Sequence, residues 1–339
     1  MKSTKRITVA IAASMMALAF AGCSKSSTDT TVTPETTAAV AVDETTAVAG
    51  ETSAATPDST MDPNMAMETT IASAEAAETV AEAGEFNAML PAAIKSAGVV
   101  KVGSDLTYPP YEFLADGSDE PIGFDVDYAK AVGEKLGVKF AFENSGFDGL
   151  IPAVEAGRYD VILSGMTDKA ERQAKVDFVD YQTSGFSILV PAGNALGVAK
   201  IEDLCGKKVA MQKGTSQIDF VKGVSAKCPT PIEISEFPTE PEAQLAIQSG
   251  RADAGVADTP PMAYFVTTTE AGKKFEMVKG EQYEAALLGM AVSKKLPELR
   301  DAVQKATTEM MADGSYDKLL AKWGLEATKI TEATVNGGK

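Results

Sequence analysis

Short apolar runs alternate with amphipathic stretches from Gly98 almost to the end of the chain. In Asp125–Leu136 the apolar residues recur at helical spacing, and Gly137 provides a typical helix stop. Runs such as Val99–Val102 are typical of buried strands. The expected strands are 99–102, 159–163, 207–211, 232–237, 252–257, 275–278 and 288–292. The expected helices are 125–136, 150–156, 216–224, 242–248, 260–266, 297–312 and 316–323. This alternation predicts an α/β fold with parallel sheets covered on both faces.

The first 23 residues follow a different pattern. Basic residues at positions 2, 5 and 6 precede the apolar run Ile7–Phe20, which is typical of a secretory signal and too short to span a membrane ahead of an external domain. Residues Leu18–Cys23 resemble a bacterial lipobox, although Phe20 stands where leucine is usual. The resemblance implies that 1–23 is a lipoprotein signal, that Cys23 is the lipidation site, and that the protein is extracytoplasmic and membrane-anchored. An ordinary signal peptide with an incidental cysteine is the alternative.

Residues 24–85 are rich in threonine, alanine, glutamate and serine, and they contain no aromatic residue. Such a composition buries too little apolar surface to offset the entropy lost on ordering. We therefore expect this segment to be a disordered tether, followed by the folded part of the chain from Phe86 onward.

Composition narrows the possible functions. The 339 residues include no histidine, which excludes imidazole-based catalysis and histidine-ligated metals, and we expect neither a metal nor a cofactor. The net charge of −17 argues against a nucleic-acid partner. Besides Cys23 there are two cysteines, Cys205 and Cys228. In an exported protein such a pair favours a disulfide, with two buried free thiols as the alternative.

An ordered set of short motifs runs through the folded part. The motifs are Val102–Phe113, Gly123–Asp127, Phe147–Ala153, Ser164–Thr167 with Glu171-Arg172, Lys213–Gln217, Gly250–Asp253, Asp258–Pro260 and Ala312–Tyr316. In this order and at these spacings the chain resembles the family 3 bacterial extracellular solute-binding proteins, the polar amino-acid receptors of ABC importers.

The resemblance implies a two-lobe fold of the type II periplasmic-binding-protein class with two hinge crossovers. Lobe 1 would comprise 86–184 plus 288–326, and lobe 2 would comprise 185–287. The hinges would lie at the ends of lobe 2, near Ser184–Ile188 and Ala285–Gly289. Residues 327–339 would form a C-terminal tail.

The resemblance also implies a pocket that holds a free amino acid between the lobes. Arg172 matches the family's carboxylate-binding arginine, and a guanidinium binds a carboxylate bidentately. Asp258 matches the ammonium-binding aspartate and follows a predicted strand, where α/β sheets place ligands. The structural alternatives are that Arg172 is a surface arginine and that Asp258 is a helix N-cap. The other implied ligand-binding residues are Asp105, Tyr108, Phe147, Ser164, Gly165, Thr167, Gln212, Thr215 and Ser216.

These remaining positions divide by role. Tyr108 and Phe147 would line the aliphatic part of the ligand, with core packing as the alternative. Residues 165 and 167 match positions that contact the ligand backbone. Thr215 and Ser216 open a predicted helix whose free N–H groups favour a carboxylate; simple capping is the alternative for Ser216.

Asp105 and Gln212 would face the tip of the ligand side chain, although Asp105 could instead cap a turn. A carboxylate there favours a donor-tipped ligand, such as glutamine, asparagine, histidine, arginine or lysine, over glutamate or aspartate. Glutamine-selective relatives carry lysine and histidine at the positions of Gln212 and Ala257, which argues against a simple glutamine receptor.

The implied function is that of a substrate-binding component, a monomer that captures a polar amino acid and delivers it to an ABC permease. One alternative is a ligand-sensing receptor for a signalling partner. Another is a dehydratase on the same fold, which would need a pocket acid of raised pKa; Asp105 and Asp258 are the candidates. We expect a binding protein rather than an enzyme.

Overall fold

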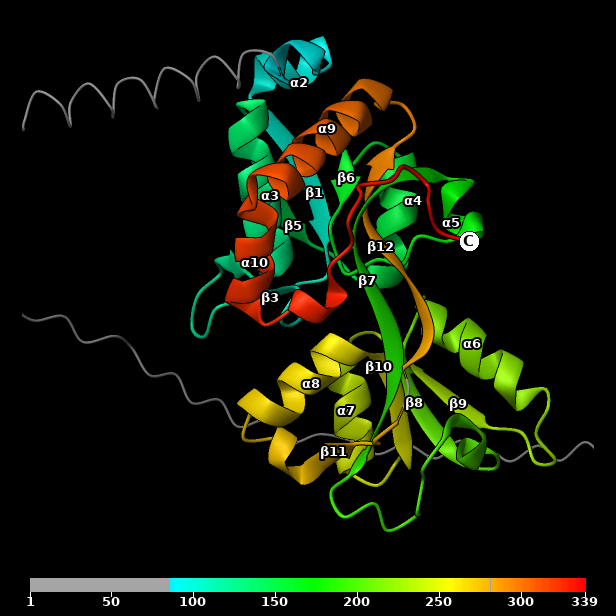
Figure 1. Cartoon of the computed structure of the whole chain (residues 1–339). Coiled ribbons are helices and arrows are strands. Elements are labelled where there is room, and N and C mark those ends of the chain that lie inside the picture. Colours follow the sequence, from blue (N-terminus) through cyan, green and yellow to red (C-terminus); the bar gives the residue numbers. More distant parts are fainter. Residues whose placement is uncertain (1–85, 281) are drawn as a thin grey trace, which may run out of the picture. The chain divides into compact units, whose positions relative to one another are not determined.

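Two lobes of mixed helix and strand make up the part of the chain that the computed structural model describes, residues 86–280 and 282–339 (Figure 1). The predicted signal and tether, residues 1–85, lie outside the described residues. The strands are β1 Val99–Ser104, β2 Thr107–Tyr108, β3 Glu112–Leu114, β4 Pro121–Ile122, β5 Lys139–Asn144, β6 Val161–Ile162, β7 Val176–Pro191, β8 Lys208–Gln212, β9 Glu233–Phe237, β10 Ala254–Asp258, β11 Phe275–Met277 and β12 Tyr283–Ser293. The helices are α2 Ala92–Ala97, α3 Phe124–Leu136, α4 Leu150–Glu155, α5 Ala170–Gln173, α6 Ser216–Ser225, α7 Glu240–Gln248, α8 Thr259–Thr268, α9 Pro297–Asp313 and α10 Ser315–Trp323.

One sheet continues through both lobes in the order β5-β1-β6-β12-β7-β10-β8-β9, with β11 also paired to β7. In lobe 1, β1 runs parallel to β5 and β6, and in lobe 2, β8 runs parallel to β9 and β10. The predicted parallel pairing is therefore confirmed for these strands. It is wrong for β7 and β12, which run antiparallel to each other and to the neighbours they meet, because each crosses from one lobe to the other.

The strand β7 changes partners along its length. Its first part pairs with β12 as far as Phe186, and Phe186–Pro191 also pairs with β10 and β11 of the second lobe. β12 pairs with β6 near its end, through Ala291 and Val292. Figure 1 shows β7 and β12 as the two long strands that connect the lobes. A movement of one lobe against the other must pass through these two strands.

Helices cover both faces of the sheet in each lobe. In lobe 1, α3 and α9 pack on one face around the fully buried Phe124 and Val303, and α4 packs on the other through Leu150. In lobe 2, α6 covers one face, while α7 and α8 cover the other through Ile247 and Met262. Buried apolar strands between two helical layers are the expected core of an α/β lobe.

The predicted pairing of the two cysteines is present in lobe 2. Cys205 and Cys228 form a disulfide with Cα atoms 5.5 Å apart. The bond joins the chain just before β8 to the chain just after α6. It therefore holds together two elements that reach the interlobe region at their other ends.

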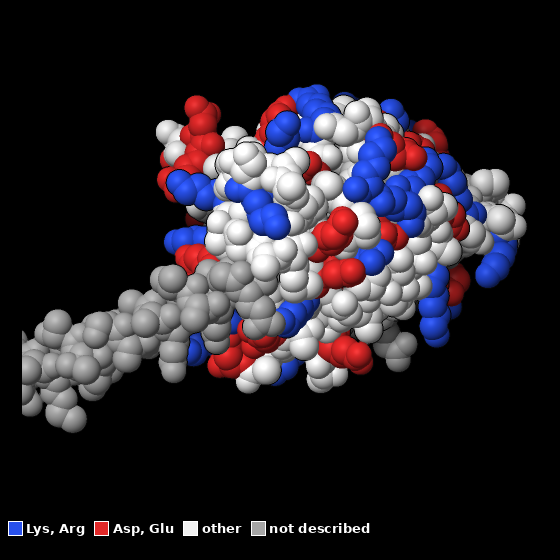
Figure 2. Space-filling model, turned by 90° about the horizontal axis from the view of Figure 1, so that it is seen from above, with Lys and Arg blue, Asp and Glu red and all other residues white. Residues whose placement is uncertain are grey.

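The outer surface carries both signs of charge. Figure 2 shows basic and acidic side chains interspersed over one face. None of the helices in the described part of the chain combines the length and apolar character needed to cross a bilayer.

Candidate ligand-binding site

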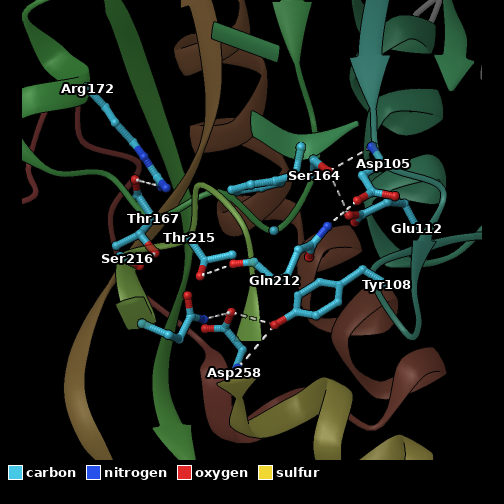
Figure 3. Close-up of a pocket in the computed structure, with 13 residues that line it drawn as sticks. Asp105, Tyr108, Glu112, Ser164, Thr167, Arg172, Gln212, Thr215, Ser216 and Asp258 are labelled. Carbon is cyan, nitrogen blue, oxygen red and sulfur yellow. Dashed lines mark hydrogen bonds between the residues drawn. The ribbon is translucent and has the colours of Figure 1, made fainter. Parts of the chain in front are cut away.

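A pocket between the lobes brings together all eleven residues that the sequence singled out for ligand binding (Figure 3). Lobe 1 contributes one wall from the ends of β1 and β6 and from α5, and lobe 2 contributes the other from the ends of β8 and β10 and the start of α6. The lining also includes two residues that were not predicted, Glu112 and Gln217. The residues that line the pocket are Asp105, Tyr108, Glu112, Phe147, Ser164, Gly165, Thr167, Arg172, Gln212, Thr215, Ser216, Gln217 and Asp258.

Arg172 is a buried cation without a carboxylate partner. Its guanidinium donates to the carbonyl oxygen of Thr167 at 2.8 Å and to that of Gly214 at 3.1 Å, and it lies 5.5 Å from the centre of the Phe147 ring. No described carboxylate lies within ion-pair distance of it. Burial lowers the pKa of Arg172 to about 10, so the side chain still carries its charge at neutral pH. A buried charge of this kind calls for an anionic partner.

The start of α6 faces the same region. Thr215 occupies the N-cap position, but its hydroxyl donates to the carbonyl oxygen of Gln212 and makes no capping bond. The Ser216 hydroxyl bonds instead to that of Thr167 at 2.9 Å, so the capping alternative for Ser216 is not what the structure has. The first N–H groups of the helix lack intrahelical acceptors and, with Arg172, can bind a carboxylate.

Asp258 is a buried carboxylate with one oxygen held and one without a donor. Its Oδ2 accepts from the Tyr108 hydroxyl and from Gln217 Nε2, both at 2.8 Å. Its Oδ1 has no hydrogen-bond partner among the described residues. Asp258 occupies the N-cap position of α8, yet its side chain makes no capping bond. Burial raises the pKa of Asp258, and a cation placed at Oδ1 would lower it again.

Asp105 and Gln212 meet across the pocket. Gln212 Nε2 donates to Asp105 Oδ2 and also to the carbonyl oxygen of Pro238, at 3.2 Å for the latter. The other carboxylate oxygen of Asp105 accepts from the Thr107 hydroxyl at 2.7 Å. Asp105 therefore takes part in the local turn and also reaches into the pocket. Burial raises the pKa of Asp105, because the charged carboxylate is poorly solvated there. A hydrogen-bond donor from the ligand would stabilise the charged form.

Glu112 places a second acid beside Asp105. It is fully buried, its Oε1 accepts from the Ser164 hydroxyl at 2.9 Å, and its Oε2 has no donor among the described residues. Behind it lies Asp125, which accepts from the amide of Gly165 at 3.1 Å. Burial and the neighbouring Asp125 raise the pKa of Glu112 well above its usual range, and burial raises that of Asp125 to about 6.

Only weak sequence signals pointed to the two pocket residues that were missed. Glu112 and Gln217 both lie inside the recognised motifs, but neither motif says which side chains point inward. Glu112 sits in a three-residue strand, too short for alternation to identify a buried face. Gln217 is the second residue of α6, where a polar side chain is ordinary.

Gly165 is required by close packing as well as by its backbone. Its φ of +49° lies in the left-handed region, and a Cβ there would come within 3.1 Å of the Tyr111 ring and 3.3 Å of the Tyr108 ring. A side chain at this position would push the aromatic wall of the pocket aside. The glycine thus lets the Tyr108 and Tyr111 rings pack closely against the loop.

Comparison with known proteins places these residues in a wider context. The family model for bacterial extracellular solute-binding proteins, family 3, matches residues 100–326. The chain is 32% identical over 257 residues to the arginine-binding protein ArgT of Corynebacterium glutamicum, covering 74% of this chain and 83% of that one. It is 32% identical over 228 residues to the histidine-binding periplasmic protein of Escherichia coli K12, covering 66% and 86%. The solved structure of an ancestral arginine-binding protein bound to arginine matches with a TM-score of 0.62 and 39% identity, covering 67% of this chain and 98% of that one.

Proposed function

The chain belongs to the bacterial extracellular solute-binding proteins of family 3, and on that premise we propose that it captures an amino acid with a cationic side chain, such as L-arginine, and delivers it to an ABC importer. Its relatives are amino-acid-binding proteins of ABC transporters, and the chain shares their substrate-binding role. The ligand class is the step that we add.

One observation carries the proposal: two buried charges of opposite sign line the same pocket, and neither has a counter-ion of its own. Among the described residues, Arg172 donates hydrogen bonds only to backbone carbonyl oxygens, and Asp258 has an oxygen without a donor. A free amino acid supplies a carboxylate for the first and an ammonium for the second. Burying both charges is favourable only when each is paired.

The acid excess supports a cationic side chain. Asp105 and Glu112 adjoin Ser164 at one end of the pocket, and Arg172 is the only basic residue in the lining. The buried Glu240 adds little to this excess, because burial and the charges of Asp258 and Asp105 raise its pKa to about 8 and leave it mostly protonated at neutral pH. Such surroundings attract a cation and repel a second carboxylate. The names of an arginine-binding and a histidine-binding relative agree with this direction.

Calorimetry with L-arginine tests the clamp. We expect Arg172→Ala and Asp258→Asn each to weaken binding about 10²-fold to 10⁴-fold, because either change leaves one buried ligand charge unpaired. Asp258→Asn keeps a side chain of the same shape between Tyr108 and Gln217. Arg158→Ala is the matched control, since Arg158 is an exposed arginine that pairs with Glu143. Parental affinity in a folded Arg172→Ala variant would refute the clamp.

Competing ligands test the selectivity. Saturation at about 100 times Kd stabilises a folded protein by about 2.7 kcal/mol, which a thermal-shift screen detects. L-arginine, L-lysine, L-histidine and L-glutamine should shift the unfolding temperature in the order of their affinities, and L-glutamate should do so least. A preference for L-glutamate would overturn the cationic ligand class and leave the clamp intact.

The remaining parts of the proposal concern catalysis, oligomeric state and cellular location. Asp105 and Asp258, the candidate acids for a dehydratase, are each held by neighbouring donors, and we propose that they bind ligand without turnover. We further propose that the protein acts as a monomer outside the cytoplasm and is held at the membrane by a lipid on Cys23. The motif before Cys23 supports the anchor.

A further inference from the structure

The last residues of the chain pair with lobe 1. Residues 329–339, here called the strap, follow the range matched by the family model, which ends at residue 326. Val335 of the strap forms an antiparallel bridge with Val179 of β7. The amide of Asp180 donates to the carbonyl oxygen of Thr334 at 2.9 Å, and that of Asn336 donates to the carbonyl oxygen of Phe178 at 3.1 Å. The strap therefore covers the edge of β7 that faces away from β12.

Beyond this pairing, the strap reaches the loop of residues 167–173. Figure 1 shows its red trace running back along the sheet and ending beside α5. The amide of Gly338 donates to Asp168 Oδ2 at 2.7 Å, and the carbonyl oxygen of Gly338 accepts from Gln173 Nε2 at 3.0 Å. Gln173 Nε2 also donates to Asp168 Oδ1 at 2.8 Å. One residue of the strap thus joins both ends of the segment 168–173.

That segment carries the carboxylate-binding side of the pocket. Thr167 precedes it, and Arg172 lies within it. The carbonyl oxygen of Thr167 accepts a hydrogen bond from the guanidinium of Arg172. The amide of Asp168 donates to the carbonyl oxygen of Leu287 on β12 at 2.8 Å. A shift of Asp168 would move Thr167 directly, and through it the main acceptor that orients Arg172.

The contact depends on glycine. A Cβ at Gly338 would lie 2.1 Å from the carbonyl oxygen of Asp168. One at Gly337 would lie 2.3 Å from Thr334 Oγ1. Neither close approach tolerates a side chain without movement of the strap or the loop. A methyl group at Gly338 therefore separates the strap from Asp168 while changing no residue of the pocket.

We propose that the strap is a positioning element for the ligand site: its Gly338 holds the loop 167–173, and thereby Thr167 and Arg172, in the arrangement that binds the ligand carboxylate. The inference rests on the proposed function of the pocket. None of the hydrogen bonds described above joins a side chain of the strap to a residue of the pocket. The effect of Gly338 on binding therefore passes through the loop.

Two variants of the full chain test the proposal, Gly338→Ala and a deletion of residues 337–339. Hydrogen exchange of the ligand-free protein reports on amides 168–174, with β8 of lobe 2 as the internal reference. We expect several-fold faster exchange in the loop and no change in β8. Calorimetry with L-arginine should show about 3-fold to 30-fold weaker binding, the range for losing one or two ordinary hydrogen bonds. Glu332→Ala, an exposed position of the same strap, should behave as the parent.

A double-mutant cycle separates positioning from general destabilisation. Gln173→Ala removes the side chain that ties Gly338 to Asp168, so combining it with Gly338→Ala should weaken binding no more than the stronger single change. Multiplied effects, or unchanged exchange in the loop at any affinity, would overturn the proposal. If the parent fails to bind L-arginine, the proposed function fails, and the exchange comparison still decides the role of the strap.

Discussion

Asp105 meets two requirements at once. It completes a turn through Thr107, and it presents its other oxygen to Gln212 from the opposite lobe. A glutamine on that side can donate or accept, so it does not decide the charge of the ligand tip. The carboxylate does, because it carries the charge that faces the tip, whereas burial and the neighbouring Asp125 raise the pKa of Glu112 and favour its neutral form. The selectivity of the pocket therefore depends most on Asp105.

Asp105→Asn should weaken L-arginine binding about 10-fold to 100-fold, weaken L-glutamine less, and relax the rejection of L-glutamate. The change preserves shape and removes the charge that faces a cationic tip. Calorimetry with the three ligands measures the effect, and Asp119→Asn, at an exposed position, is the control. Equal losses for arginine and glutamine would show that charge is not what Asp105 contributes.

The same residue predicts a proton linkage. Burial raises the pKa of Asp105, and a bound cation would lower it again. Binding of L-arginine should therefore release a proton in the weakly acidic range just above the ordinary aspartate pKa, and affinity should rise with pH through that range. Titrations in two buffers of different ionisation enthalpy detect the release, which should shrink in Asp105→Asn. No buffer dependence in the parent would contradict a cationic tip at Asp105.

At the residue scale, the sequence located the pocket well because the family motifs carry positions as well as types. Its lining residues come from several separate segments between Asp105 and Asp258, and no periodicity connects them. What the motifs could not convey was which further side chains turn inward, and so Glu112 and Gln217 were missed. The free Oδ1 of Asp258 is likewise visible only in three dimensions.

At the scale of elements, periodicity identified most helices and most of the parallel strands, but it missed the parallel strand β5 and the crossing strand β7. The strand β7 buries Asp177, Asp180 and Gln182, polar residues that conceal its apolar pattern. Asp180 is tolerated there because Thr334 and Gly337 of the strap donate to it, at 2.5 and 3.1 Å. The strap was predicted to be a tail, and β7 was not predicted as a strand. Both errors have the same cause: the strap and β7 pair with each other although they lie about 150 residues apart in the sequence. Strands of two or three residues, such as β2 and β3, are too short for any pattern.

The disulfide makes a prediction at the same scale. Cys205 and Cys228 are 23 positions apart, and closing a loop of that length stabilises the folded state by about 3 kcal/mol in the chain-entropy model. Replacing both cysteines by serine should lower the unfolding temperature by about 6–12 °C. Reductant should lower it similarly in the parent and have no effect in the double variant. Two thiols that alkylate in the native, unreduced protein would contradict the bond.

At the scale of the whole molecule, the lobes meet across the pocket through groups that a ligand also needs. Tyr108 reaches Asp258, and Thr167 reaches Ser216, from opposite lobes. At the rim, Lys169 pairs with Asp219 at 2.6 Å and Lys213 with Asp148 at 2.7 Å. Such partly exposed ion pairs contribute little to stability, about 0–1 kcal/mol each. Closure on a ligand must therefore draw mainly on the buried charges of the clamp, which makes capture dependent on the ligand.

An importer receptor must also stay near its permease, and Cys23 offers the means. The basic residues and the apolar run before it are typical of an exported chain, and each buried methylene of an attached lipid would contribute about 0.8 kcal/mol to membrane binding. Expressed in a bacterium that processes lipoproteins, the parent should fractionate with membranes and have the mass of the chain from Cys23 plus acyl groups. Cys23→Ser should yield soluble or unprocessed protein without that mass, whereas Ser24→Ala should leave anchoring unchanged. An acylated, membrane-bound Cys23→Ser variant would place the anchor elsewhere, and a soluble, unmodified parent would make the segment an ordinary signal peptide.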